Sequence, residues 1–251
     1  MSDHSGQIYT LGQHAGLHAP LKNACSQCSL HELCLAEGLD LADLMRIDEL
    51  VQKRRRVARQ EALYQAGDPF TAIYAVRSGF FKTEGLLGDG REQITGFQMA
   101  GELLGLDGIS TERYACTAVA LEDSEVCVIP FAEMEDLGRA VPALQRNFHR
   151  LMSRELVQDQ NLLVLLGSSR AEERIAAFLL NLSRRLSRRG YAASEFVLRM
   201  TREEIGSYLG LKLETVSRTL SKMQRQQIIE VQQRHIRIID IGALEQQSQC
   251  Q

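Results

Sequence analysis

The strongest constraint on the fold is one long, uninterrupted helical stretch near the middle of the chain. Pro142 suits the first turn of a helix, and neither Gly nor Pro follows it until Gly167. A helix of about 25 residues is roughly 37 Å long, so the other parts must be arranged around this rod. Along it, apolar residues follow the alternating four- and three-residue steps of a coiled-coil seam: Leu144, Phe148, Leu151, Leu162 and Leu165.

Polar residues interrupt the middle of this seam. Glu155 and Gln158 take its next two positions, and Asp159 lies beside them. The helix either packs along its own domain or pairs weakly with a second copy, because a two-fold axis along it would bring carboxylates face to face. Apolar burial of roughly 7–15 kcal/mol is then nearly offset by association costs of about 4–15 kcal/mol and repulsion of about 1–4 kcal/mol. The dimer interpretation assigns six residues to the interface: Leu144, Phe148, Leu151, Glu155, Asp159 and Leu162.

Composition indicates a globular chain that stays in a reducing compartment. A length of 251 residues with 44% apolar residues suits one large or two small domains. No apolar run approaches the roughly 18 residues that cross a bilayer, and the N-terminus lacks a basic start followed by an apolar core. We therefore expect no membrane association, no signal peptide and a cytoplasmic location. The six cysteines are then reduced thiols or metal ligands rather than disulfides.

The net charge of −3 conceals an asymmetry between the two ends of the chain. Residues 1–167 carry 15 basic and 23 acidic side chains, whereas residues 168–251 carry 14 basic and 9 acidic ones. A basic C-terminal region on an acidic body favours a polyanion as the partner of that region.

A cysteine cluster follows residues 1–24, which are polar and expected to be poorly ordered. Cys25, Cys28 and Cys34 form a C-x2-C-x5-C pattern. In a reduced protein this pattern favours a metal or cluster site, with a redox-switched thiol group or chance as the alternatives. Thiolates select zinc or iron–sulfur clusters, and both require four ligands. The candidates for the fourth ligand are His31, Cys116, Cys127 and Cys250.

One helix and a series of short strands are predicted for the rest of the N-terminal half. The helix is expected from Asp40 to Val57, with the basic run Lys53–Arg56 as its solvated end. A short helix is expected near Ala132–Leu137, after Pro130. Alternating runs between glycine turns predict five strands, at Ala72–Val76, Phe80–Glu84, Gln93–Phe97, Thr117–Leu121 and Glu125–Ile129. Such strands are typical of a small antiparallel barrel or roll.

The basic C-terminal region begins with a predicted amphipathic helix. Ser169 and Glu172 have the spacing of a capping box at its start, and Gly190 ends it. Its apolar stripe comprises Ile175, Phe178, Leu179, Leu182 and Leu186. Four arginines near its end are either a solvated face or phosphate contacts: Arg184, Arg185, Arg188 and Arg189.

A helix-turn-helix is the strongest local prediction. Thr201 and Glu204 form a capping box, Gly210 makes the turn, and a second helix begins near Leu213. One polar face of that helix carries Glu214, Ser217 and Arg218. Arginine can bond bidentately to guanine, and glutamate can accept from cytosine N4, so this face suits the major groove of DNA. Ile228–Val231 and Ile236–Ile239 predict a hairpin wing, with Arg234 and His235 at its tip near phosphate.

This order of elements resembles the cyclic-AMP receptor superfamily, and several motifs narrow the resemblance. They are similar to the oxygen-sensing fumarate–nitrate reduction regulator (FNR) branch. The segments that carry the similarity are Cys25–Cys34, Gln93–Phe97, Val126–Phe131, Ala171–Phe178, Asn181–Arg185 and Gly210–Arg218.

The resemblance implies an α+β protein with four segments. Residues 1–24 are a poorly ordered N-terminus and residues 25–140 a cysteine segment with an antiparallel β-roll sensor. Residues 141–167 form a dimerisation helix, and residues 168–251 a winged helix-turn-helix that binds double-stranded DNA. No nucleophile motif or dinucleotide-binding loop is present, so we expect no enzyme activity.

The resemblance also implies the cofactor and the partners. Cys25, Cys28, Cys34 and Cys127 would hold a [4Fe–4S] cluster that oxygen degrades, whereupon the long helices part and DNA binding is lost. Glu214, Ser217 and Arg218 would contact a TTGAT-type half-site in an inverted repeat. The family carries an acidic residue at the position of Asp159, and RNA polymerase would bind loops of the β-roll. A structural zinc or a thiol switch remains the alternative to the cluster.

Two positions depart from the cyclic-AMP receptors. Gly101–Gly105 resembles their phosphate-binding loop, but Arg113 is followed by Tyr114 instead of Ser or Thr. No small hydroxyl residue is then available to bind a cyclic phosphate, so we expect no cyclic-nucleotide control. Cys116 is expected to be a buried structural thiol.

Overall fold

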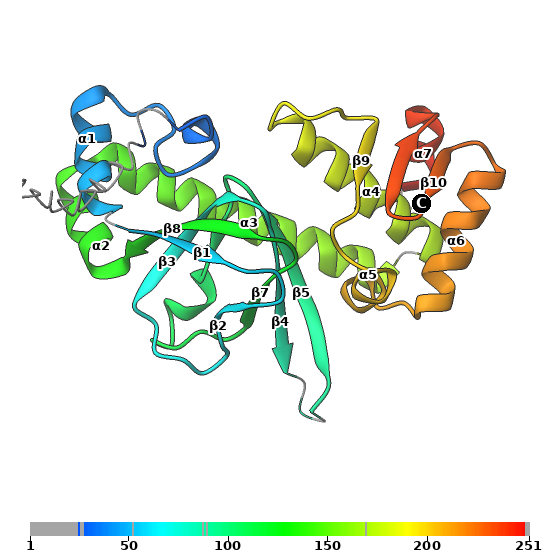
Figure 1. The fold of residues 1–251 in the computed structure, drawn as a ribbon, viewed down its shortest axis with the longest axis horizontal. Helices are drawn as coiled ribbons and strands as arrows, with labels where there is room; N and C mark the ends of the chain where they lie inside the picture. Colours follow the sequence, from blue (N-terminus) through cyan, green and yellow to red (C-terminus); the bar gives the residue numbers. More distant parts are fainter. Residues whose placement is uncertain are drawn as a thin grey trace, which may run out of the picture.

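The structure is a computed structural model that describes Cys25 and residues 28–51, 53–86, 88, 90–168 and 170–248. The predictions for residues 1–24, Ser169, Cys250 and the side chain of His31 lie outside the described residues. The long helix α3 (Pro142–Ser168) connects a β-rich body at one end with a helical body at the other (Figure 1). Within the described residues, no helix combines the length and apolar character needed to span a bilayer.

The N-terminal helix is shorter than predicted. Helix α1 (Leu41–Leu50) begins after Asp40, whose carboxylate accepts a hydrogen bond from the Asp43 N–H at 2.9 Å. The predicted extension to Val57 is wrong, because Lys53–Val57 forms strand β1, antiparallel to β8 (Ser124–Pro130). Strand β1 lies at the edge of its sheet, where a basic run is well tolerated because it discourages pairing with other chains.

The β-rich body is an antiparallel roll of two four-stranded sheets, which confirms the predicted fold class. Their strand orders are β1-β8-β3-β6 and β2-β7-β4-β5. The side chains between them form an apolar core that includes Tyr64, Tyr74, Phe81 and Tyr114. The remaining strands are β2 (Ala62–Tyr64), β3 (Ala72–Ser78), β4 (Phe80–Leu86), β5 (Glu92–Met99), β6 (Leu103–Leu104) and β7 (Thr117–Ala120).

Helix α2 (Phe131–Ala140) and the first turns of α3 close one end of the roll. Leu144 of α3 is only 1% exposed and belongs to a core shared with α1, α2 and strands β3 and β8. The start of α3 is therefore fixed to the N-terminal body.

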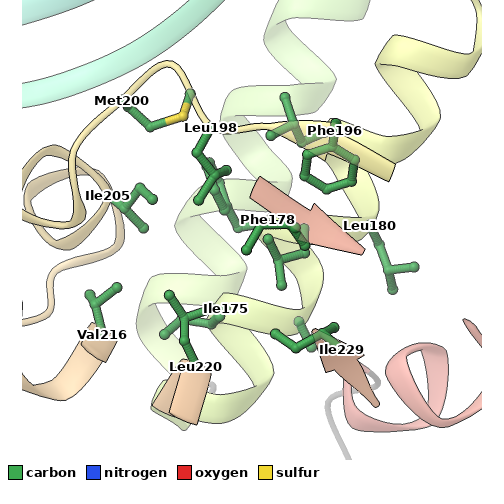
Figure 2. Packing of buried hydrophobic residues seen from close by; sticks show 14 of the residues in the cluster. Ile175, Phe178, Leu180, Phe196, Leu198, Met200, Ile205, Val216, Leu220 and Ile229 are labelled. Carbon is green, nitrogen blue, oxygen red and sulfur yellow. The ribbon is translucent and has the colours of Figure 1, made fainter. Parts of the chain in front are cut away.

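The C-terminal body is a winged helix-turn-helix built around α4 (Ala171–Ser187). The predicted capping box is displaced by one residue, since Arg170 is the N-cap and its N–H donates to Glu173 at 2.9 Å. Apolar side chains from α4, both helices of the motif and the wing converge on one core (Figure 2). The other elements are α5 (Arg202–Leu209), α6 (Leu213–Arg225), α7 (Ile241–Ser248), β9 (Glu195–Val197), β10 (Ile229–Gln232) and β11 (His235–Ile238).

The predicted capping and turn of the helix-turn-helix are confirmed. The Glu204 N–H donates to Thr201 Oγ1 at 3.1 Å, and the Thr201 N–H donates to Glu204 Oε2 at 2.7 Å. Gly210 ends α5 with a φ of 63°. Gly206 is required by packing, because a Cβ there would lie 2.6 Å from the carbonyl oxygen of Leu211.

Candidate cofactor site and nucleic-acid interface

Four cysteines line one small cavity between the N-terminal segment and the roll. Cys25, Cys28 and Cys34 come from the turns before α1, and Cys127 comes from β8. The cavity has a volume of about 40 Å³, and its other walls are mostly apolar, from α1, β3, β8 and α3. The structure therefore brings together the four cysteines that the resemblance selected.

Cys116 lies elsewhere in the roll. Cys116 directly precedes β7, and its thiol is close to Thr95 of β5 in the same sheet, with Thr95 Oγ1 and Cys116 Sγ 3.6 Å apart. Cys116 is half-buried, whereas a buried structural thiol had been predicted. Of the other candidates for a fourth ligand, the His31 side chain and Cys250 are not among the described residues.

The donor set of the cavity fits a thiolate-ligated cofactor. Burial raises the pKa of Cys25, and it raises the pKa of Cys34 to about 12. Burial also raises the pKa of Cys127, although Arg54 and Arg77 oppose that shift. Buried thiols of this kind need a cation to become thiolates, and four soft sulfur donors suit zinc or iron–sulfur.

Arg54 is a neighbour of Cys127, although it does not line the cavity. It pairs directly opposite Cys127 in the β1–β8 ladder, and its Nε is buried without a hydrogen-bond partner. A buried donor of this kind is costly unless an acceptor approaches it.

No group of three or more His, Cys, Asp and Glu side chains in the described part of the chain is arranged to hold a single metal ion.

The face of α6 that was predicted to read DNA is accessible. Glu214 and Arg218 are exposed, whereas Val216, Leu220 and Met223 are buried on the opposite face. Ser217 is half-buried and accepts a hydrogen bond from Arg202 Nη1 of α5 at 3.3 Å. In the wing, His235 Nε2 lies 2.9 Å from Glu195, and Arg234 is exposed.

Two of the four arginines at the end of α4 have a role that neither prediction anticipated. Arg185 and Arg189 are not a solvated face, because both bind Glu102 of the roll, with N–O distances of 2.5 and 2.6 Å. Arg184 pairs with Glu245, and Arg188 is exposed. Sequence alone offers no signal for a contact between residues more than 80 positions apart.

The long helix presents a different apolar seam to solvent from the one predicted. Leu144 is enclosed by its own protomer, and Phe148 and Leu151 pack against the same core. Leu162 packs against the C-terminal core. The exposed seam is shifted by one residue and comprises Met152 (38% exposed), Leu156 (59%), Asp159 and Leu163 (69%).

Glu155 faces inward, toward the charges between the two bodies. Burial raises its pKa to about 7, helped by Glu102 and Asp159 and opposed by Arg185. A carboxyl group with a raised pKa holds its proton in the folded state from about pH 4.5 to about pH 7, so folding stability falls as the pH rises through this window.

We expect Glu155→Gln to remove this pH dependence, because glutamine does not titrate. Above pH 7 the variant should be more stable than the wild type by about 1–3 kcal/mol, and at pH 5 the two should be similar. Urea unfolding of the metal-free protein at pH 5, 6, 7 and 8 measures this. A difference in unfolding free energy between the two proteins that stays constant from pH 5 to pH 8 would contradict this expectation.

Two parts of the chain match known protein domains, and most of the chain is similar to known regulators. Residues 173–247 match the Crp-like helix-turn-helix domain, and residues 54–140 match the cyclic nucleotide-binding domain. The chain is 48% identical to the transcriptional regulatory protein btr of Bordetella pertussis over 88% of this chain and 92% of that protein. It is 42% identical to the fumarate and nitrate reduction regulatory protein of Yersinia pestis over 88% of this chain and 89% of that protein.

The chain belongs to the FNR branch of the CRP/FNR superfamily. It is 45% identical to the transcriptional activator protein anr of Pseudomonas aeruginosa, over 86% of this chain and 88% of that protein. Among solved structures, FixK2 of Bradyrhizobium japonicum is 31% identical with a TM-score of 0.73, covering 79% of this chain and 98% of that chain. This FNR-type chain is therefore a DNA-binding transcription regulator and not an enzyme.

Proposed function

We propose that this FNR-type protein is an oxygen-responsive regulator. In the absence of oxygen, a [4Fe–4S] cluster is held by Cys25, Cys28, Cys34 and Cys127. The protein that carries the cluster dimerises and binds inverted-repeat promoters. The observation that carries the proposal is the single apolar cavity that all four thiols line. The cluster supplies the sensitivity to oxygen, and the protein converts its presence into a structural state.

Contacts between the cysteine segment and α3 support this conversion. Asn147 of α3 is buried, and its Nδ2 donates to the carbonyl oxygens of Leu35 and Glu37 at 3.1 and 2.6 Å. Arg154 of α3 lies 3.5 Å from the Glu37 carboxylate. A rearrangement of the cysteine segment therefore acts directly on the helix that presents the exposed seam.

The exposed seam of α3 is suited to weak, adjustable pairing. Met152, Leu156 and Leu163 would bury apolar surface against a second copy, and Asp159 would meet its counterpart near the two-fold axis. The interface predicted at Asp159 is retained in this proposal, and Met152, Leu156 and Leu163 are added to it.

We expect Asp159→Ala to strengthen dimerisation of the air-exposed protein by about fivefold or more, since it removes a like-charge repulsion of about 1–4 kcal/mol. Sedimentation equilibrium measures the dimer constant. Gln160→Ala is a suitable control, because residue 160 is also exposed but lies outside the seam. An unchanged monomer fraction for Asp159→Ala would show that the repulsion does not limit pairing.

DNA is read by the exposed face of α6. Arg218 and Glu214 contact base edges of a TTGAT-type half-site, with Ser217 beside them. Two such helices in a dimer read half-sites about one turn of DNA apart. RNA polymerase is the proposed protein partner, through loops of the roll.

Cyclic-nucleotide control is not part of this proposal. The ring of Tyr114 stacks on that of Tyr64, with centroids 4.0 Å apart, and its hydroxyl donates to the Ala72 carbonyl oxygen at 2.8 Å. The tyrosine therefore fills space inside the roll and is already engaged with protein groups.

The deciding experiment is metal analysis paired with oligomeric state. Anaerobically purified protein should contain about four irons and about four sulfides per chain. On exposure to air it should lose both and shift toward monomer. About one zinc per chain without sulfide would instead support the structural zinc alternative. A metal-free protein whose oligomeric state follows added thiol reductant would support the thiol switch.

A further inference from the structure

A buried charge cluster docks the DNA-binding domain onto the sensor roll. Glu102 follows the end of β5, Arg185 belongs to α4, and Arg189 lies in the turn just after α4. Arg185 Nε lies 3.0 Å from Glu102 Oε1, and Arg189 Nη2 lies 2.6 Å from the same oxygen. The side chain of Arg185 is only 17% exposed, that of Arg189 5% and that of Glu102 16%. These charges are therefore held largely out of water.

The cluster is well satisfied by hydrogen bonds. Arg185 Nη2 also donates to the Phe97 carbonyl oxygen, and Arg189 Nε donates to that of Ala100. The Met99 N–H donates to Glu102 Oε2 at 3.0 Å. The arginines oppose burial strongly enough to hold the pKa of Glu102 below its usual range. Loss of one partner would leave a buried, uncompensated charge, which is strongly destabilising.

A second contact joins strand β5 to helix α5. The Ile94 N–H donates to Ser207 Oγ at 3.0 Å, and Gln93 Nε2 donates to the Ser207 carbonyl oxygen. The Phe97 ring packs edge-on against Tyr208, with centroids 5.2 Å apart. The two bodies thus share an apolar core as well as the charge cluster.

The turn that carries Glu102 also contacts the cysteine segment. Gly101 has a φ of 88°, and a Cβ there would lie 3.0 Å from the Cβ of Leu33. Gly101 lines the cavity of the four thiols as well. The turn Met99–Glu102 therefore touches the cysteine segment on one side and the two arginines on the other.

We propose that Arg185 and Arg189 are positioning residues for DNA reading, which fix the DNA-binding domain to the sensor through the turn Met99–Glu102. The cysteine segment acts on this contact through Leu33 and Gly101. Because Glu214 and Arg218 stay exposed in the docked arrangement, docking orients the recognition helix without covering it. A dimer needs two recognition helices at a fixed separation, and a domain that is already docked loses less entropy on binding.

This route is separate from pairing of α3. The sensor can then alter DNA affinity in two ways, by forming the dimer and by orienting each reader within it. The inference rests on the proposed function only for its DNA measurement.

The test is Glu102→Gln, followed by hydrogen exchange and DNA binding. The Ile94 N–H reports docking directly, since its acceptor belongs to the other body. We expect its exchange to accelerate about tenfold or more, while that of Ile73–Val76 in the roll stays unchanged. Specific DNA affinity of the dimer should fall about tenfold at an unchanged dimer constant. Glu122→Gln is the matched control, because it breaks the more exposed pair with Arg199 and should change both quantities less than twofold.

Two further variants complete the test. Arg189→Lys keeps the charge but loses the donor to Ala100, and it should give an intermediate acceleration even if Glu102→Gln folds poorly. Leu33→Ala should accelerate Ile94 exchange without touching the charge cluster. Wild-type exchange in Glu102→Gln and Arg189→Lys, or faster exchange with unchanged DNA affinity, would overturn the positioning role. Wild-type exchange in Leu33→Ala would overturn the link to the cysteine segment. Hydrogen exchange is also measured on iron-free protein, so the docking result can be interpreted even if the protein holds no cluster.

Discussion

Cys127→Ser is expected to remove nearly all iron from anaerobically purified protein, from about four irons per chain to near zero. Serine replaces a soft sulfur donor with a hard hydroxyl that does not ionise at neutral pH, so it is a poor ligand for iron. The three remaining cysteines all precede α1 in the chain, and Cys127 of β8 is the proposed ligand that would tie them to the roll. Iron, acid-labile sulfide and visible absorbance measure the loss.

Cys116→Ser is the matched control for this experiment. Cys116 lies in the same roll but outside the thiol cavity, and its thiol is close to Thr95 and Gly85. Its replacement should leave iron content within error of the wild type. Full iron content in Cys127→Ser, or loss of iron in Cys116→Ser, would show that the ligand set is different.

Loss of Cys127 should also affect the DNA reader at a distance. Without a cofactor to hold the cysteine segment, Leu35 and Glu37 lose part of the restraint that positions Asn147 of α3. The anaerobic variant should therefore resemble the air-exposed wild type in oligomeric state and in DNA affinity.

Local spacing was sufficient to predict the parts of this protein that depend on neighbouring residues. The cap at Thr201, the turn at Gly210 and the two faces of α6 follow from short-range rules, and all are present. The five predicted strands were recognised as short runs between turn residues, although β3 is apolar and buried from Ala72 to Val76 and shows no alternation. Strand β1 was missed because Lys53–Arg56 contains no apolar residue that could reveal the alternation.

Features set by tertiary packing were not accessible from spacing. Two seams one residue apart both fit α3, and only burial shows that the seam of Leu144 faces inward while that of Leu156 is exposed. The pairing of Glu102 with Arg185 joins distant segments, so a basic cluster looked like a solvated face. For the thiols, spacing gave three of the four, and the choice of Cys127 over Cys116 required the family resemblance.

Arg218→Ala is expected to abolish the preference for the G-containing half-site while leaving nonspecific binding nearly intact. A bidentate arginine–guanine contact contributes about 1–3 kcal/mol of discrimination, or roughly 5- to 150-fold in each half-site. Arg218 is exposed on α6, so its truncation leaves no cavity, whereas its neighbours Val216 and Leu220 hold the helix in the core. The folded domain should therefore be unchanged.

Salt dependence separates base reading from simple attraction to phosphate. If Arg218 contacts a base, its loss lowers affinity for the operator but not for random DNA, and the slope of log K against log salt changes little. Arg225→Ala, at the exposed end of the same helix, is the matched control and should leave the sequence preference intact. An equal loss of affinity for operator and random DNA in Arg218→Ala would assign this arginine to phosphate. Base reading by α6 would then rest on Glu214 and Ser217, since these share its exposed face.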